Sequence, residues 1–367
     1  MNRQECSMLD NAQIKQVIND FQDPSTEIKL GETNPGIMVA EESGKQTVSV
    51  VLRYPIKGYI DQLSSELTSA LQQAGAENIN VVVSSEIIKH KVQQGVQALD
   101  NIKNIIAVGS GKGGVGKSTT SANLALALAA EGATVGVLDA DIYGPSQPRM
   151  LGANGRPESP DGKSMNPVEC YGIQTMSIGF LIDEEEPMIW RGPMVTQALQ
   201  QLLGETNWKN LDYLIIDLPP GTGDIQLTLS QKVPVSGAVI VTTPQDISLL
   251  DARKAYKMFE KVKVPVLGIV ENMSTHICSQ CGHEEHIFGD GGGKRMAEQY
   301  NLNLLGSLPL DIKIREDADS GKPSVVTEPD ADISMAYRQI ARRVGARLAM
   351  QGKDYSAAFP NIVIKND

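Results

Sequence analysis

The segment from Gly111 to Thr120 reads GKGGVGKSTT and fits the pattern G-x-x-x-x-G-K-[ST]. It follows the apolar run 105–108 and precedes a segment with helical periodicity, which is the context in which this pattern forms a phosphate-binding loop. Its glycines let backbone amides point at phosphate oxygens, and the N-terminus of the next helix adds further unpaired amides. The pattern predicts a nucleoside triphosphate site in which Lys117 reaches the β- and γ-phosphates and the Ser118 hydroxyl binds Mg²⁺. The nucleotide-binding residues predicted in this loop are Gly111, Lys112, Gly113, Gly114, Val115, Gly116, Lys117, Ser118 and Thr119.

A second lysine, Lys112, stands inside the loop in the form K-G-G-x-G-K-[ST]. An ordinary phosphate-binding loop does not need this lysine, because Lys117 already serves the nucleotide. With it the sequence resembles the deviant P-loop ATPases, the group that contains MinD, ParA, ArsA and the nitrogenase iron protein. The resemblance implies that the nucleotide is ATP and that Lys117 and Lys112 are both catalytic, with Lys112 reaching the partner's nucleotide across a homodimer interface. The alternative for Lys112 is a solvated lysine on a loop.

Composition argues against several classes of protein and partner. The chain has 367 residues, 41% hydrophobic and 4% aromatic side chains, a formal net charge of −11 and a pI near 5.0. The scarcity of aromatic rings and the negative charge argue against nucleic-acid binding. The first residues lack the apolar core of a signal peptide, and the longest apolar runs are too short for a membrane span. Four cysteines in a chain of this length do not indicate a disulfide framework, so we expect a soluble cytoplasmic protein with reduced thiols.

Changes in hydrophobic periodicity along the chain predict two structured units. Residues 1–88 are expected to form a small α/β accessory domain without a catalytic cluster, which we interpret as a docking module or, alternatively, as a stabilising appendage. A linker over 89–103, an ATPase domain over 104–350 and a loosely held tail over 351–367 follow. Within the accessory domain we expect helices at 12–21 and 60–74 and strands at 36–40, 47–52 and 79–83.

From residue 105 onward, strand and helix patterns alternate as in a doubly wound, mostly parallel α/β sheet with helices on both faces. Ligands of such sheets bind beyond the carboxyl ends of the strands, which is where the motifs of this chain fall. The expected strands are 105–108, 134–138, 213–216, 238–242, 266–270 and 304–308, and the expected helices are 117–131, 194–203, 225–232, 249–262 and 333–348.

Polar residues end three of these strands. Asp139 and Asp141 are separated by one residue and point to opposite sides of an extended backbone, so we expect them to have different roles. The resemblance implies that Asp141 orients the attacking water and that Asp139 lies near the metal shell; the alternative for both is a turn or N-cap carboxylate. Asp217 ends an apolar strand as a Walker B acid does, where it would hold Mg²⁺ directly or through water. By the same resemblance Asn272 reads the adenine edge, and otherwise it is a turn residue.

Cys278 and Cys281 form a C-x-x-C close to three of the chain's four histidines. A thioredoxin-type redox pair normally begins a helix, which the polar flanks make doubtful here, and two unreactive surface cysteines are a further alternative. A metal site accounts for the pattern best. Because tetrahedral zinc and [4Fe–4S] centres ordinarily want four protein donors, a twofold dimer would supply the two missing thiolates. The nearby histidines are His276, His283 and His286.

The combination of motifs is more specific than any one of them. The chain contains the deviant loop, DADIYGPS at 139–146, DLPPGTGD at 217–224, TTPQD at 242–246, and ENMS at 271–274 followed by C-x-x-C. Together these motifs resemble those of the Mrp/ApbC family of iron–sulfur cluster carrier ATPases. The resemblance covers about residues 100–350, and the first unit resembles the accessory domain of bacterial Mrp proteins. The resemblance implies that Cys278 and Cys281 bridge a [4Fe–4S] cluster between two subunits and that ATP is hydrolysed slowly. It also implies that the cluster passes to apo iron–sulfur target proteins, with scaffold proteins as further candidate partners.

Three alternatives stay open at this point: a positioning ATPase like MinD and ParA, an ATP-dependent electron donor like the nitrogenase iron protein, and a zinc-bridged ATPase dimer. The cysteine and histidine mixture suits zinc. A positioning ATPase would need a basic amphipathic C-terminal helix or a DNA-binding patch, whereas residues 359–367 contain a proline and a single lysine.

Overall fold

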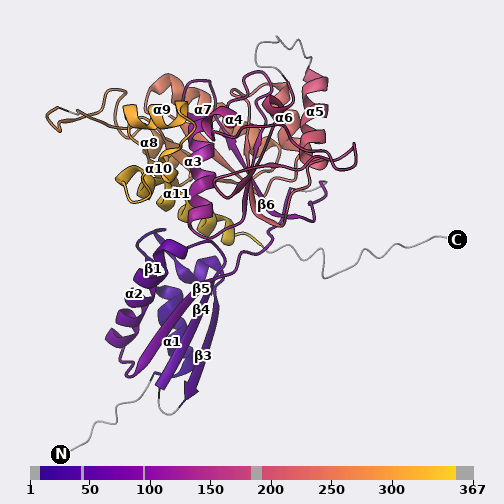
Figure 1. Cartoon of the computed structure of the whole chain (residues 1–367). Coiled ribbons are helices and arrows are strands. Elements are labelled where there is room, and N and C mark those ends of the chain that lie inside the picture. Colours follow the sequence, from indigo (N-terminus) through magenta and orange to yellow (C-terminus); the bar gives the residue numbers. More distant parts are fainter. Residues whose placement is uncertain (1–8, 43–44, 94–95, 183–191, 279, 353–367) are drawn as a thin grey trace, which may run out of the picture.

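The computed structural model describes residues 9–42, 45–93, 96–182, 192–278 and 280–352. Most of the expected tail therefore lies outside the described residues. The chain folds into a small N-terminal unit and a larger α/β unit, which lie one below the other in Figure 1. Each unit has its own hydrophobic core, and two residues of the last helix belong to the core of the small unit.

The large unit is built on a sheet with the strand order β15-β12-β11-β6-β10-β7-β9-β8 within the described residues. All neighbouring strands pair in parallel except the edge pair β8–β9, which is antiparallel. The central strands are continuous apolar runs, as expected for strands that are buried on both faces of the sheet. The expected mostly parallel, doubly wound sheet is confirmed. The strands are β6 (Ile102–Gly109), β7 (Val135–Asp139), β8 (Val168–Cys170), β9 (Ile173–Ser177), β10 (Leu211–Asp217), β11 (Gly237–Thr242), β12 (Val266–Glu271) and β15 (Leu304–Ser307).

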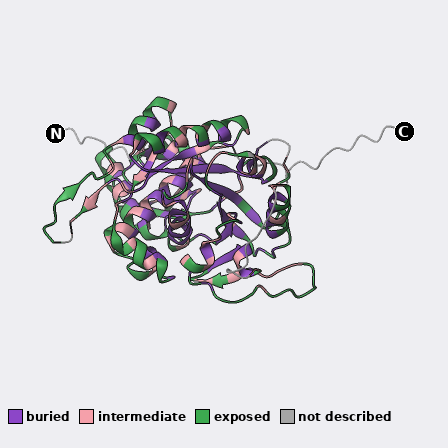
Figure 2. Cartoon of the chain, turned by 90° about the horizontal axis from the view of Figure 1, so that it is seen from above, coloured by how far each residue is buried: buried purple, intermediate pink, exposed green. Residues whose placement is uncertain are grey.

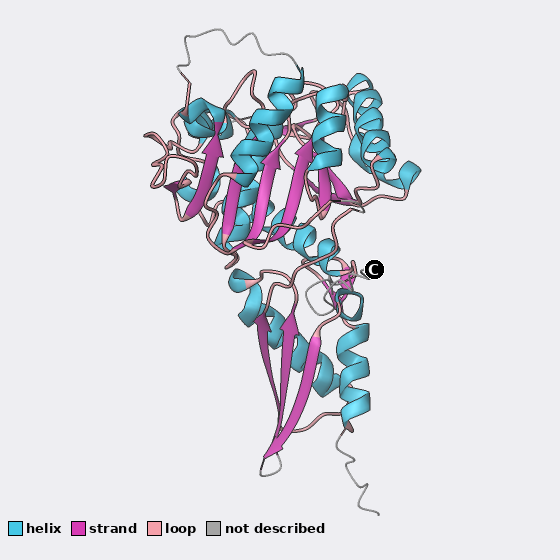
Figure 3. Cartoon of the chain, turned by 90° about the vertical axis from the view of Figure 1, so that its right-hand side faces the viewer, coloured by secondary structure: helices cyan, strands magenta, loops and turns pink. Residues whose placement is uncertain are grey.

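Helices lie on both faces of this sheet (Figure 3), and the sheet between them is buried (Figure 2). The helix that follows the phosphate loop, α3, is buried over most of its length because α11 covers its outer side. No helix in the described ranges is long and apolar enough to cross a lipid bilayer. The helices are α3 (Lys117–Ala130), α4 (Gln147–Met150), α5 (Gly192–Gly204), α6 (Asp224–Lys232), α7 (Asp246–Lys261), α8 (Gly292–Tyr300), α9 (Ile312–Asp319), α10 (Ser324–Thr327) and α11 (Asp332–Ala349), with a 3₁₀ turn η3 (Ile178–Phe180).

The expected strands and helices of the large unit are found, with ends that differ by a few residues. The sequence reasoning missed the edge strand β8, its neighbour β9 and the helices α4, α8, α9 and α10. Strand β8 and the helices α4 and α10 are only a few residues long, and β8 lies at the sheet edge with no fully buried residue. Such segments carry too few residues for a hydrophobic period to emerge.

The small unit is a sheet of β3, β4 and β5 with helices over one face (Figure 3). Alternate residues of β4 are buried, as expected for a strand with one covered face. Leu63, Leu67 and Leu71 form the buried stripe of α2. The elements are α1 (Asn11–Asp20), β1 (Gln22–Asp23), β2 (Ile28–Lys29), η1 (Leu30–Thr33), β3 (Gly36–Glu42), β4 (Lys45–Leu52), η2 (Lys57–Tyr59), α2 (Ile60–Gln73) and β5 (Ile79–Ser85).

The segment expected as a linker is partly built into the large unit. His90 and Gln93 are buried, and β6 already begins at Ile102. The Gln93 side chain donates to the carbonyls of Ser230 and Val233 at 2.6 and 2.9 Å. These bonds attach the segment to the end of α6.

Glu131, the residue after α3, joins the two units. Its carboxylate is fully buried, accepts a hydrogen bond from Arg338 Nε at 2.8 Å and lies 3.5 Å from Arg342 Nε. The other carboxylate oxygen accepts from the amide of Gly58 at 2.9 Å, and the Glu131 carbonyl accepts from the amide of Lys57 at 2.9 Å. The helix that starts at the phosphate loop therefore ends on the small unit.

Replacing Glu131 by alanine should lower the free energy of unfolding by about 3 kcal/mol, because it leaves two arginines on α11 without their buried counter-charge. Urea unfolding followed by circular dichroism measures this change. Glu169→Ala removes an exposed pair with Lys209 and should cost less than about 1 kcal/mol. Equal losses in the two variants would contradict the role given to Glu131.

Candidate functional site

The phosphate loop connects the end of β6 at Gly109 to the start of α3 at Lys117. Gly114 and Gly116 have φ angles of +79° and +80°, a region that favours glycine. Thr120 Oγ1 donates to the Gly116 carbonyl at 2.9 Å and holds the loop onto the first turn of α3. The backbone thus has the strand–loop–helix geometry that the sequence pattern predicts for phosphate binding.

Two loop glycines also lie too close to other segments to carry a side chain. A Cβ at Gly111 would lie 2.0 Å from the carbonyl carbon of Asp251 in α7. A Cβ at Gly116 would lie 2.1 Å from Asn272 Nδ2. Packing therefore requires glycine at both positions, and at Gly116 the backbone conformation requires it as well.

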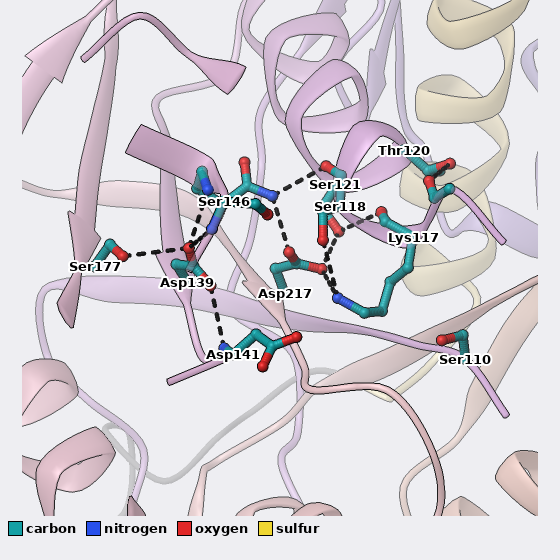
Figure 4. Close-up of polar contacts among 12 residues, drawn as sticks. Ser110, Lys117, Ser118, Thr120, Ser121, Asp139, Asp141, Ser146, Ser177 and Asp217 are labelled. Atoms are coloured by element: carbon teal, nitrogen blue, oxygen red, sulfur yellow. Dashed lines mark hydrogen bonds and ion pairs between the residues drawn. The ribbon is translucent and has the colours of Figure 1, made fainter. Parts of the chain in front are cut away.

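Residues from two separate motifs, Lys117 and Ser118 of the phosphate loop and the strand-end acid Asp217, meet in one contact (Figure 4). Lys117 Nζ lies 2.5 Å from Asp217 Oδ1 and 3.2 Å from Ser118 Oγ. Only 6% of the Lys117 side chain and none of the Asp217 side chain is exposed, so each charge depends on the other for its partner. Ser121 Oγ donates to the same Asp217 oxygen at 2.9 Å.

Asp139 lies opposite Asp217 in the register of β7 and β10. Its carboxylate is fully buried and accepts hydrogen bonds from the amides of Asp141, Ser146 and Gln147 at 2.9 to 3.1 Å. Burial, together with the negative charge of Asp217, raises the pKa of Asp139 to about 7. These bonds make Asp139 the anchor of the turn before α4, while its place near the metal shell stays a prediction.

Asp141 is half-buried, and its carboxylate points away from that of Asp139 in Figure 4. Burial raises the pKa of Asp141, and the positive charge of Lys117 opposes this shift. The two carboxylates thus have different surroundings, as expected from their spacing. The water-orienting role of Asp141 stays a prediction.

Gln147, which the sequence reasoning missed, bridges two parts of the site. Its Nε2 donates to the Ser118 carbonyl at 3.0 Å and to Asp217 Oδ2 at 2.9 Å. In the described part of the chain, Gln147 Oε1 and Ser146 Oγ are buried without a hydrogen-bond partner. Mg²⁺ prefers oxygen ligands and keeps several bound waters, so the unpartnered oxygen of Gln147, whose amide group contacts both Ser118 and Asp217, fits a hydrated Mg²⁺. The only sequence signal was the position of Gln147 after DADIYGPS.

Asn272 lies against the phosphate loop. Its Nδ2 donates to the Val115 carbonyl at 2.9 Å, and its backbone amide donates to the Thr242 carbonyl at 2.8 Å. This contact gives Asn272 a structural role in the loop, and its reading of adenine stays a prediction. Lys112 is half-buried and forms no ion pair with the described residues.

The cysteine pair lies in a hairpin formed by β13 (His276–Ile277) and β14 (Glu284–Glu285). The Cys278 amide donates to the His283 carbonyl at 2.9 Å, and Ser279 lies outside the described residues. Cys278 is half-buried, and Cys281 is exposed. The amides of Gln280 and Cys281 lower the pKa of the Cys278 thiol, which favours the thiolate that binds metal. The pair does not begin a helix, as a thioredoxin-type pair would.

Within the described part of a single chain, no group of three or more His, Cys, Asp and Glu residues could hold a metal ion. The Nδ1 atoms of His276 and His286 lie 3.0 and 3.1 Å from the carbonyls of Leu310 and Ser274. Each of these rings therefore has one nitrogen bonded to the backbone. The hairpin of one chain offers two thiols at ligand spacing.

Alanine at Gly116 should weaken ADP binding at least about tenfold, because the left-handed conformation alone costs about 1–2 kcal/mol and the new methyl group would collide with Asn272. Isothermal titration calorimetry with Mg-ADP measures the affinity. Gly204→Ala, at the end of α5, has open space around its Cβ and serves as the matched control. An unchanged affinity of the Gly116 variant would show that the loop tolerates a side chain there.

The chain is similar to known proteins over most of its length. A family model described as ParA, NUBPL iron-transfer P-loop NTPase, matches residues 101–345. The chain is 54% identical over 344 residues to the iron-sulfur cluster carrier protein of Haemophilus influenzae, covering 93% of this chain and 92% of that protein. It is 48% identical over 285 residues to the mouse iron-sulfur cluster transfer protein NUBPL, covering 77% and 88%. A nucleotide-binding protein from Archaeoglobus fulgidus, solved in complex with ADP, superposes with a TM-score of 0.56 at 41% identity, covering 64% of this chain and 91% of that one. The chain therefore belongs to the iron–sulfur cluster carrier family of ParA-type P-loop NTPases.

Proposed function

We propose that this protein is an ATPase that carries a [4Fe–4S] cluster as cargo, holds it between the two subunits of a homodimer and passes it to apo-proteins. The observation that carries this proposal is the hairpin with Cys278 and Cys281, which lies a few residues beyond the strand end that contacts the phosphate loop. The relatives named as cluster carrier and cluster transfer proteins support it. They favour cargo transfer over the positioning and electron-donor alternatives.

The nucleotide of this proposal is ATP, bound with Mg²⁺. Lys117 binds the phosphates after exchanging its contact with Asp217 for a phosphate oxygen. Ser121 and Gln147 continue to orient Asp217 when Lys117 moves, because their hydrogen bonds to its carboxylate are independent of the lysine. Ser118 and Asp217 would hold Mg²⁺, and the ion supplies electrostatic neutralisation of the phosphate oxygens when bound.

Hydrolysis in this proposal needs two further groups. Asp141 orients the attacking water, and burial places its pKa above that of an exposed aspartate, which suits a group that accepts hydrogen bonds from water near neutral pH. Lys112 acts on the nucleotide of the partner subunit, since it forms no ion pair with the described residues of its own chain. The need to assemble two subunits makes hydrolysis slow and ties it to carriage of the cluster.

Each subunit of the proposed dimer gives two thiolates to the cluster, which completes the four that a [4Fe–4S] centre requires. The exposure of Cys281 suits transfer of the cargo to another protein. The partners are a second copy of this chain, apo iron–sulfur target proteins and scaffold proteins, with no role for nucleic acid or membrane. The proposed location is the cytoplasm, where thiols stay reduced.

Removing both thiols should abolish cluster binding. After anaerobic reconstitution with iron and sulfide, the wild type should show broad visible absorption and one cluster per two chains by metal analysis and sedimentation, and Cys278→Ala/Cys281→Ala should show neither. Cys170→Ala is the matched control, because its thiol contacts Thr175 in the sheet and should not affect loading. Equal absorption in the double variant would overturn the proposal, and zinc in place of iron would favour the zinc-bridged alternative.

Lys112→Ala should lower ATP hydrolysis by at least about 100-fold, as loss of a cation acting in trans does in related phosphoryl transfers, with Mg-ADP affinity nearly unchanged. Lys163→Ala, on an exposed loop, is the control. A mixture of Lys112→Ala and Lys117→Ala subunits should regain part of the activity, because one subunit binds nucleotide and the other supplies Lys112. A mixture as inactive as its components would rule out action across the interface.

A further inference from the structure

The end of β12 contacts the phosphate loop through a nearly buried side chain. Asn272, with 9% of its surface exposed, donates from Nδ2 to the Val115 carbonyl. A loop carbonyl that is held outward leaves the neighbouring loop amides turned inward, toward the phosphates. Anything that orders the phosphate loop therefore also fixes the position of Asn272.

The residues after Asn272 are tied to the segment that follows β15. The Ser274 amide and hydroxyl both donate to the Leu308 carbonyl, at 2.9 and 3.1 Å. The Leu308 amide donates in return to the Glu271 carbonyl at 2.8 Å. Met273 between them has a φ of +58°, which is uncommon for a residue with a side chain and costs about 1–3 kcal/mol. The connection from Asn272 to Ser274 is thus short and held at both ends.

Two histidines attach the cysteine hairpin to this same segment. His286 Nδ1 lies 3.1 Å from the Ser274 carbonyl, and His276 Nδ1 lies 3.0 Å from the Leu310 carbonyl. The Leu310 amide donates to the Thr275 carbonyl at 2.7 Å. The hairpin is therefore anchored at both ends: His286 holds it to the connection that begins at Asn272, and His276 holds it to the segment after β15, which is itself bonded to that connection.

We infer that residues 272–276 relay nucleotide binding to the cysteine pair, with Asn272 as the contact to the phosphate loop, and Ser274, His276 and His286 as positioning residues for the hairpin. This inference deepens the proposed function and rests on it for the role of the cysteines. Nucleotide orders the phosphate loop, the loop holds Asn272, and the hairpin is held through Ser274. Because coupling between two binding sites is reciprocal, occupation of the hairpin by its cargo raises or lowers nucleotide affinity by the same factor.

The relay can be tested on the full-length chain without cluster. The probe is Mg-ADP, and the readout is the rate at which iodoacetamide alkylates Cys278 and Cys281, followed by mass spectrometry with and without saturating nucleotide. In the wild type, the alkylation rate with saturating Mg-ADP should differ from the rate without nucleotide by about fivefold or more. About fivefold is the lower end of typical coupling between two binding sites. In Ser274→Ala and in His286→Ala the ratio should move close to one, although both variants still saturate with Mg-ADP.

Ser69→Ala is the matched control, because it also removes a serine hydroxyl that donates to a carbonyl, here that of Ser65 on the exposed side of α2. It should keep the wild-type ratio. Sedimentation at the same concentration establishes that each variant has the wild-type oligomeric state. A wild-type ratio of one, or an unchanged ratio in both Ser274→Ala and His286→Ala, overturns the relay while leaving cluster loading intact. Failure of cysteine-dependent cluster loading overturns the proposed function instead, because the alkylation assay contains no cluster.

Discussion

The buried pair of Lys117 and Asp217 is the interaction on which the site depends. Both side chains are buried. The lysine at the start of α3 and the acid at the end of β10 must therefore stay together to offset the cost of burying each charge. The pair fixes the phosphate loop against the central strands. Gln147 and Ser121 add hydrogen bonds to the same carboxylate, and Asp139 lies opposite it on the next strand. The contacts around Asp217 thus set the relative positions of Lys117, Asp217 and the turn that carries Asp141.

Helix α3 connects this site to the N-terminal unit. The helix begins at Lys117, and the residue after its last turn is Glu131, whose carboxylate binds the amide of Gly58 and the arginines of α11. A helix of 14 residues spans about 21 Å, so the nucleotide site and the joint between the units are two ends of one rigid element. The small unit, expected from the sequence as a separate accessory domain, is packed onto the ATPase unit and shares part of its core with α11.

The cysteine hairpin of one chain offers two thiols, half of the donors that the proposed cluster requires. Its thiols are at or near the surface, while the histidines beside them bond to backbone carbonyls. This arrangement combines an accessible pair of thiols with a base that is bonded to the backbone of neighbouring segments. Part of this anchor lies just beyond the strand end that contacts the phosphate loop, so the proposed cargo site and the phosphate loop are connected by a short stretch of backbone.

The local motifs of this protein could be predicted from the sequence because each depends on residues that are close together along the chain. Glycines at Gly114 and Gly116 set backbone conformation, the apolar runs before Asp139 and Asp217 form buried strands, and the spacing of Cys278 and Cys281 is that of a metal-binding pair. Edge strand β8 and helix α4 were missed because elements of three or four residues are too short to show a hydrophobic period. The roles of Gln147, Glu131 and His286 were decided only by the tertiary structure. Each bonds to atoms that the fold brings close from another segment, and neither the partner nor the burial of such a side chain is encoded in its neighbours along the chain.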